Sequence, residues 1–290
     1  MFIEVVEQEL KKIEEHITDS TPQNEVLKGL RNLGLDDFGL LLLSMPASAY
    51  PRISNLLPRM ADDEVQKNWT GNYGGALLMQ SLDFVRSVSY NFCKYTGETL
   101  ENKTILDFGC GYGRIARLMY YFTNPDNFYG VDPWDKSIEI CHADGLTKNF
   151  YQSEYLPKQL PTGDKKFSLI YAFSVYTHLS EKATRISLHT LLQHLEPNGL
   201  LVITIRPVEY WFVDTNSRSA EEKEQLISLH RKNGFSFLPH QREAVDGDVT
   251  YGDTSMTLDW LQNLLPEAKI VGTDRSLADP YQIYVFIRKK

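Results

Sequence analysis

The sequence Ile105-Leu106-Asp107-Phe108-Gly109-Cys110-Gly111-Tyr112-Gly113-Arg114 decides the fold of this chain. Its first four residues predict a short buried strand, and the glycines after it predict a tight turn into a helix. Glycine lets a backbone approach a ligand that a Cβ atom would block, and the first N–H groups of the helix then face that ligand. Val131-Asp132 ends the next apolar run, where an aspartate can accept hydrogen bonds from ribose hydroxyls. The stretch predicts a nucleoside-containing cofactor, with a plain strand-to-helix connection as the alternative.

The spacing of the glycines separates two kinds of nucleoside cofactor. A dinucleotide fingerprint has glycine or alanine at its sixth position, and Arg114 stands there instead. The observed pattern is G-x-G-x-G, with Asp107 two residues before it. Carboxylate oxygens at that place suit a cofactor that carries amino-acid and sulfonium groups better than they suit a pyrophosphate.

These residues resemble the first motif of the class I S-adenosylmethionine-dependent methyltransferases, which is matched by Asp107, Gly109, Gly111 and Gly113. Further stretches resemble the second, fourth and fifth strands of the family, at 129–132, 167–174 and 195–203. Ser168 replaces the usual aspartate of the fourth strand, and Asn198 replaces the first glycine of the turn before the fifth. The resemblance covers about residues 100–205 and implies a methyltransferase with S-adenosylmethionine as its cofactor.

The resemblance also indicates which residues hold the cofactor. We expect contacts from the glycine turn, from the ends of neighbouring strands and from a segment before the first long helix: Asp107, Gly109, Cys110, Gly111, Gly113, Asp132, Pro133, Ser153, Glu154, Ser174, Trp69 and Gly71. Asp132 is the expected ribose ligand, whereas Ser153 and Glu154 match the adenine position by place and not by residue type. Residues 69–75 are interpreted as a loop over the methionine end of the cofactor, with a flexible linker as the alternative.

Alternating strand and helix patterns predict an α/β fold. Strands are expected at 104–108, 127–131, 149–152, 167–173, 199–205, 268–273 and 282–288, with helices at 76–95, 113–122, 135–144, 181–195 and 258–265. This order predicts a Rossmann-like, doubly wound, mostly parallel seven-stranded sheet. Residues 1–75, with an amphipathic helix at 2–17, are expected to form a helical N-terminal extension or lid on a methyltransferase core at 76–290.

An insertion follows the fifth strand at residues 207–257. It is expected to contain a charged helix at about 219–232, an apolar segment at 235–238 and a turn at 251–253. Ligands of such sheets bind beyond the carboxyl ends of the strands, where this insertion leaves the core. We therefore expect it to wall the site of the methyl acceptor, and a packing or dimer element is the alternative.

The loop after the fourth strand supplies the candidate base. Histidine is the commonest base near neutral pH, and His178 lies in the loop that the family uses to line the reacting methyl group. The alternative is that His178 caps the following helix, and His240 is a second candidate. Expected substrate contacts come from Tyr176, Arg206 and Tyr251, with Arg206 either holding an anionic acceptor group or pairing with a nearby acid.

The composition of the chain limits which kinds of partner and cellular location are expected. With 290 residues and 42% hydrophobic content the chain can bury a full core, and a formal charge of -8 argues against a nucleic-acid partner. The cysteines show no metal-ligand spacing, so no metal is expected. No segment is long and apolar enough to span a membrane, and the N-terminus does not read as a signal peptide, which makes cytoplasmic residence the expectation.

The acceptor is the least determined part. Short motifs resemble methyltransferases of sugar and polysaccharide modification, which implies O-methylation of a carbohydrate or related small polar acceptor. The alternatives are a natural-product or other small-molecule O- or N-methyltransferase, or a non-catalytic scaffold that binds the cofactor. The amphipathic N-terminal helix also makes a homodimer a reasonable expectation.

Overall fold

The structure is a computed structural model that describes residues 2–18, 20–214 and 218–290. The helices are α1 (Glu4–His16), α2 (Gln23–Leu30), α3 (Leu35–Leu43), α4 (Pro51–Leu56), α5 (Asp63–Thr70), α6 (Gly74–Thr96), α7 (Arg114–Met119), α8 (Asp135–Ala143), α9 (Glu181–His194), α10 (Tyr210–Val213), α11 (Ala220–Asn233) and α12 (Leu258–Leu264). The strands are β1 (Ile105–Phe108), β2 (Phe128–Asp132), β3 (Phe150–Gln152), β4 (Phe167–Ala172), β5 (Leu195–Ile205), β6 (Phe235–Pro239), β7 (Gly252–Met256), β8 (Ala268–Arg275) and β9 (Ile283–Lys289).

The central sheet is the expected mostly parallel one. In the described part of the chain it has seven strands in the order β3-β2-β1-β4-β5-β9-β8. The strands from β3 to β5 pair in parallel, and β9 pairs antiparallel with both β5 and β8. The strand order reverses beside β1, so the loops after β1, β2 and β4 meet at one edge, where α/β sheets bind ligands.

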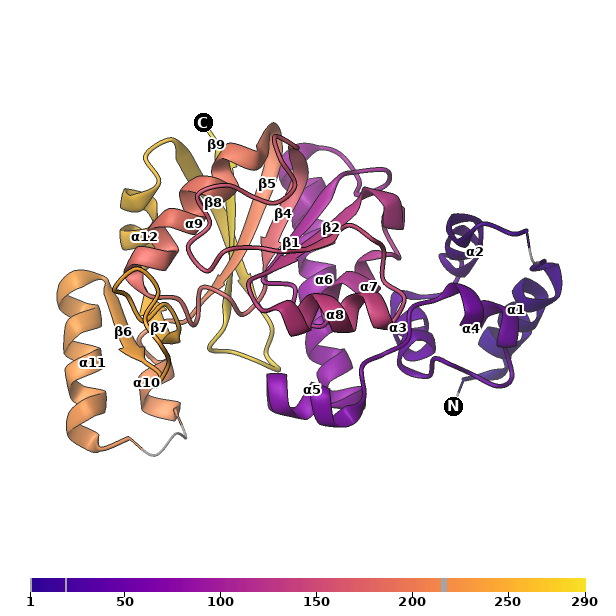
Figure 1. The fold of residues 1–290 in the computed structure, drawn as a ribbon, viewed down its shortest axis with the longest axis horizontal. Coiled ribbons are helices and arrows are strands. Elements are labelled where there is room, and N and C mark those ends of the chain that lie inside the picture. The colour runs from indigo at the N-terminus through magenta and orange to yellow at the C-terminus, as the bar shows by residue number, and fades with distance from the viewer. Residues whose placement is uncertain (1, 19, 215–217) are drawn as a thin grey trace.

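Helices cover both faces of this sheet (Figure 1). Successive strand residues point to opposite faces, so Ile105 joins the core beneath α6 and α7, whereas Leu106 joins the core beneath α9 and α12. All four residues of β1 are buried. A strand buried on both sides needs an apolar run rather than an alternating one, and Asp107 is the exception within it.

The remaining elements lie at the two ends of the molecule. Helices α1 to α4 lie at one end, and α10, α11 and the β6–β7 pair lie at the other (Figure 1). Helix α3 packs on α6 and α7 through Gly39, where a Cβ atom would lie 3.0 Å from Leu78. Within the described residues, no helix is long and apolar enough to cross a membrane.

Two local expectations were wrong. Residues 251–253 do not form a turn, because Gly252 and Asp253 begin β7, which pairs antiparallel with β6. Gly252 serves strand pairing, since a Cβ atom there would lie 2.0 Å from the carbonyl oxygen of Leu238. Residues 69–75 are also not one loop: Trp69 lies in the last turn of α5, Gly71 caps that helix in the left-handed conformation, and α6 begins at Gly74.

Candidate active site

The glycine turn has the backbone that its sequence demands. Gly109, Gly111 and Gly113 have φ angles of 74°, 52° and 76°, a region that side chains with a Cβ atom rarely adopt. The N–H of Gly109 donates to the carbonyl of Val131 at 2.8 Å, which docks the turn on β2. A Cβ atom on Gly109 would lie 2.4 Å from Cγ2 of Val175, in the loop after β4. The turn therefore needs glycine both for its conformation and for the approach of this loop.

Asp132 lies against the turn as the sequence implied. Its Oδ2 accepts a hydrogen bond from the N–H of Gly111 at 3.0 Å, and its Oδ1 accepts from the N–H of Trp134 and the hydroxyl of Ser137, both at 2.9 Å. Burial raises the pKa of this carboxyl, and these donors oppose the shift. Each carboxylate oxygen can accept more than one hydrogen bond, so Oδ2 keeps capacity for a ribose hydroxyl.

Asp107 is a buried carboxyl whose hydrogen-bond donor is neutral. The hydroxyl of Tyr171 donates to its Oδ2 at 3.0 Å. Burial, with the nearby charge of Asp132, raises the pKa of Asp107 to about 8, although Tyr171 and Arg114 act in the opposite direction. A cation bound beside Asp107 would lower this pKa again, so the residue fits the ammonium group of an amino-acid cofactor.

Trp69 closes the turn from the N-terminal side. It stacks on Trp134 with ring centroids 4.6 Å apart and meets the edge of Tyr112 at 5.8 Å. Its Cε3 is the nearest atom to the position that a Cβ of Gly111 would occupy, at 4.0 Å. Sequence reasoning expected Trp69 here but missed Trp134, whose only signal was its place directly after Asp132 and Pro133.

The other expected cofactor residues fall at the same edge. The N–H of Ser153 donates to the carbonyl of Asp132 at 3.0 Å, and its buried hydroxyl has no hydrogen-bond partner among the described residues. Ser174 has φ of 60° and donates its N–H to Thr204 at 2.7 Å. Cys110 lies in the turn with its thiol toward the carbonyl of Gly111, whereas Glu154 is exposed. A glycine cradle, two buried carboxylates and a free buried hydroxyl together fit S-adenosylmethionine.

His178 lies where the loop after β4 meets the insertion. Its Nδ1 donates to the carbonyl of Gly252 at 2.8 Å, which leaves Nε2 as the nitrogen with a lone pair, 3.4 Å from Nη2 of Arg206. Its ring stacks on Tyr251 at 5.0 Å. Burial and the charge of Arg206 lower the pKa of His178 to about 4, so the imidazole is neutral at physiological pH.

A cluster of charges beside His178 was not foreseen from the sequence. Asp253 on β7 is 3% exposed and accepts hydrogen bonds from residues of four other segments: Arg206 at 2.8 Å, His240 at 3.1 Å, Tyr210 at 3.3 Å, and Arg218. Burial acts to raise the pKa of Asp253, but His240, Arg206 and His178 hold it at about 2. The segments are far apart in sequence, so no local pattern could have revealed the cluster. We call these five residues the Asp253 cluster.

The expected substrate residues do not all come together. Tyr251 lies on His178, and Arg206 lies beside it but is engaged by Asp253 and by the carbonyl of Thr177. The pairing of Arg206 with an acid is thus the arrangement observed. Tyr176 is fully buried in the core and donates its hydroxyl to Ser187 on α9, so this hydroxyl is not available to an acceptor.

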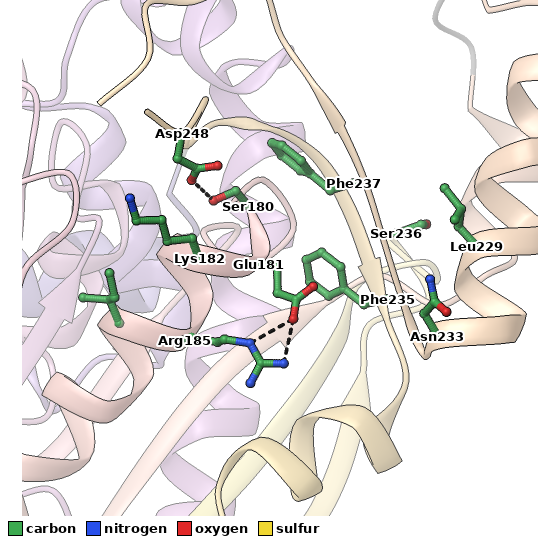
Figure 2. A pocket seen from close by; sticks show the side chains of 11 residues that line it. Ser180, Glu181, Lys182, Arg185, Leu229, Asn233, Phe235, Ser236, Phe237 and Asp248 are labelled. Carbon is green, nitrogen blue, oxygen red and sulfur yellow. Dashed lines mark hydrogen bonds and ion pairs between the residues drawn. The ribbon is translucent and has the colours of Figure 1, made fainter. Parts of the chain in front are cut away.

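A cleft of about 700 Å³ opens between the start of α9 and the α11–β6 segment (Figure 2). Figure 2 shows the Ser180–Asp248 hydrogen bond and the Arg185–Glu181 ion pair on its wall. None of the residues expected to bind cofactor or acceptor lines it. The glycine turn, His178 and Arg206 therefore all lie outside this cleft.

Comparison with solved structures agrees with the fold. The PH0226 protein from Pyrococcus horikoshii OT3 is 12% identical, with a TM-score of 0.52 over 79% of this chain and 100% of that one. The plantazolicin methyltransferase BpumL, solved with SAH, is 14% identical, with a TM-score of 0.50 over 99% of each chain. The magnesium protoporphyrin IX methyltransferase from Synechocystis PCC 6803, also with SAH, is 14% identical, with a TM-score of 0.48 over 78% of this chain and 92% of that one.

Comparison with protein families is more specific. A family model described as a methyltransferase domain matches residues 81–243, which is more than half of the chain. The match spans β1 to β6 and includes the glycine turn, Asp132 and His178. This chain belongs to the class I S-adenosylmethionine-dependent methyltransferases and takes S-adenosylmethionine as its cofactor.

Proposed function

We propose that this enzyme methylates a hydroxyl group of a small polar acceptor, such as a carbohydrate, held between the loop at 174–178 and the insertion at 207–257. The observation that carries this proposal is His178, a neutral imidazole with a lone pair on Nε2 at the carboxyl edge of β4. A hydroxyl acceptor has a proton to lose, whereas many other nucleophiles need no base. The cofactor and acceptor halves of the site then lie side by side.

The residues around the turn bind and orient. When bound, S-adenosylmethionine supplies a methyl group on a sulfonium, ready for in-line displacement. Asp107 is suited to its ammonium group and Asp132 to its ribose, while the Trp69–Trp134 stack excludes water from the turn. Methyl transfer depends chiefly on such alignment of the two reacting atoms.

His178 acts on the acceptor proton. Its Nδ1–H is held by Gly252, so Nε2 can accept a hydrogen bond from the acceptor hydroxyl and take its proton, as the C–O bond would form and the methyl–sulfur bond would break with its electron pair left on sulfur. A pKa of about 4 makes His178 a weaker base than free imidazole, and a weak base suffices because an oxygen that gains a methyl group becomes strongly acidic. Arg206 must give way to the acceptor at Nε2.

Tyr251 links the two halves of the site. Burial is the main reason that its pKa is raised, Arg242 and Arg206 oppose the shift, and the carboxylates of Asp253 and Asp132 add to it. Tyr251 is therefore electrostatically coupled both to the expected ribose ligand and to the Asp253 cluster. This coupling supports the insertion at 207–257 as the wall of the acceptor site. The insertion belongs to a methyltransferase core at 76–290. Residues 1–75 form an N-terminal extension, in which α5 is the part that serves as a lid.

The test is methyl transfer from labelled S-adenosylmethionine to a panel of sugars, sugar nucleotides, phenols and amines. We expect hydroxyl acceptors to be labelled and His178→Asn to lower kcat more than it changes KM. His189→Asn, on the exposed side of α9, is the matched control. Labelling of amines alone, or full turnover by His178→Asn, would refute the hydroxyl assignment. Binding of the cofactor with no transfer to any class would favour a scaffold.

A further inference from the structure

A second cleft, of about 480 Å³, lies at the β8 edge of the sheet. One wall is the face of α6 that carries Asp83 and Tyr90, and the other is residues 274–277, at the end of β8 and directly after it. Tyr284 on β9 also lines it. No residue of the glycine turn or of the Asp253 cluster does so, and the cleft is therefore separate from the methyl-transfer site.

Tyr284 brings an unpartnered hydroxyl to this cleft. The side chain is 1% exposed, and its ring packs against Phe84 at 5.1 Å and Phe173 at 6.3 Å. Its hydroxyl has no hydrogen-bond partner among the described residues. A buried hydroxyl without a partner destabilises the folded state. Such a group is stable when a ligand completes its hydrogen bonds.

Two carboxylates of the cleft also lack cationic partners. Asp83 accepts a hydrogen bond from the hydroxyl of Ser276, and Asp274 accepts one from the hydroxyl of Ser87, both at 2.5 Å. Neither forms an ion pair with any described residue. Burial raises the pKa of Tyr284 above its usual value, and the charges of Asp279, Asp83 and Asp274 raise it further, although the charge of Arg114 acts in the opposite direction. The Tyr284 hydroxyl therefore lies in the field of both cleft carboxylates.

The arginines of the cleft do not neutralise these acids. Arg86 pairs with Asp36 on α3 at 2.5 Å. Arg275 is exposed, and its backbone N–H is the group that bonds Asp274. At the rim, Tyr90 and Leu277 are 68% and 83% exposed and offer apolar surface. A ligand that fits has a cationic head and a short apolar body.

We propose that this cleft binds a small protonated primary amine. The three N–H groups of an ammonium match the three available acceptors, which are the carboxylates of Asp83 and Asp274 and the hydroxyl oxygen of Tyr284. The apolar part of the amine lies between Tyr90 and Leu277. Among the described residues, no group of three His, Cys, Asp or Glu is placed to hold a metal ion.

The test is calorimetric titration of the full chain, saturated with S-adenosylmethionine, with butylamine, 1-butanol and butyrate at neutral pH. We expect only butylamine to bind. Asp274→Asn should weaken it by about tenfold, because a charge-assisted hydrogen bond is lost, and Tyr284→Phe by about threefold. Affinity for S-adenosylmethionine should stay within about twofold, since these residues do not touch the turn.

Tyr151→Phe, on β3 at the opposite edge of the sheet, is the matched control and should bind butylamine as the wild type does. If Asp274→Asn does not fold, Asp83→Asn tests the other carboxylate of the cleft, which lies on α6. Binding of 1-butanol as tight as that of butylamine, or unchanged butylamine affinity in both Tyr284→Phe and the aspartate variant, would overturn the proposal.

Discussion

The glycine turn and the Asp253 cluster are built in opposite ways. The turn is made by residues 105–114 with Asp132, and each part is held by its near neighbours in the sheet. The Asp253 cluster is made by single residues that follow β5, precede α11, follow β6 and lie within α10 and β7. A binding site of the first kind can be found in a sequence, whereas one of the second kind exists only once distant segments have folded together.

The difference also predicts how each region fails. A buried cluster of opposite charges depends on its central partner, because removing Asp253 leaves Arg206 without its carboxylate and leaves Arg218 with Asp214 alone. A backbone turn depends on space and on φ angles, and its loss affects ligand binding more than it affects the core. The following variants test this contrast.

The largest effect is expected for Asp253→Ala. It leaves Arg206 and Arg218 without this buried carboxylate and should lower the free energy of unfolding by about 3–5 kcal/mol, measured by urea denaturation. The pKa of Asp253 is about 2 in the folded protein, below its ordinary value of 3.8. Its contribution to stability is therefore fully present above pH 3.8 and is lost as pH falls through about 2.

Glu243→Ala is the control for Asp253→Ala, because Glu243 is an exposed acid of the same insertion. It should change stability by less than about 0.5 kcal/mol. Equal stability of the two variants would mean that the cluster does not hold the insertion to the core.

Gly109→Ala should come next. Gly109 and Gly163 both have positive φ, but a Cβ atom would meet Val175 at 2.4 Å in the first and nothing within 4 Å in the second. Gly163→Ala therefore isolates the conformational cost, about 1–2 kcal/mol. Gly109→Ala should lower the free energy of unfolding by more than Gly163→Ala does. It should also weaken S-adenosylmethionine binding at least about tenfold, measured by calorimetry. An equal loss of stability in both variants would show that the Val175 side chain moves aside without an energetic penalty.

Asp132→Ala should weaken S-adenosylmethionine binding by about 1–3 kcal/mol, the scale of hydrogen bonds to a charged acceptor. The free energy of unfolding should fall less than in Asp253→Ala, because the donors that Asp132 satisfies lie at the edge of the sheet. Asp164→Ala, in the exposed loop before β4, should bind the cofactor normally. Undiminished binding by Asp132→Ala would remove it as the ribose ligand.

The smallest effect concerns pH. With its pKa lowered from 6.5 to about 4, His178 stays neutral as pH falls through 6.5, so kcat/KM should show no break there and should decline only toward about 4. The same shift means that His178 stabilises the fold fully above 6.5 and loses that contribution as pH falls through about 4. A break near 6.5 that disappears in His178→Asn would show that the pKa of His178 is not lowered in the free enzyme.

Much of the fold followed from local pattern. Strands β1, β2 and β4 lie within a residue or two of their expected places, because apolar runs bounded by glycine and polar residues are local signals. The β6–β7 pair was missed, since Gly252 resembles a turn residue in sequence and is instead a close contact between strands. Trp69 was expected at the cofactor, but its place at the end of α5 was not.

The sequence by itself determined the class I fold, the cofactor and the residues of the glycine turn, because these depend on spacing within short stretches and on the φ angles that glycine alone allows. Only the tertiary structure decided how His178 is paired, that Arg206 is held by Asp253, and that Tyr284 meets two carboxylates without cationic partners in one cleft. Those features depend on burial and on contacts between residues distant in the chain. Such contacts fix a side chain's charge and its free hydrogen-bonding groups, and neither is encoded in any local pattern.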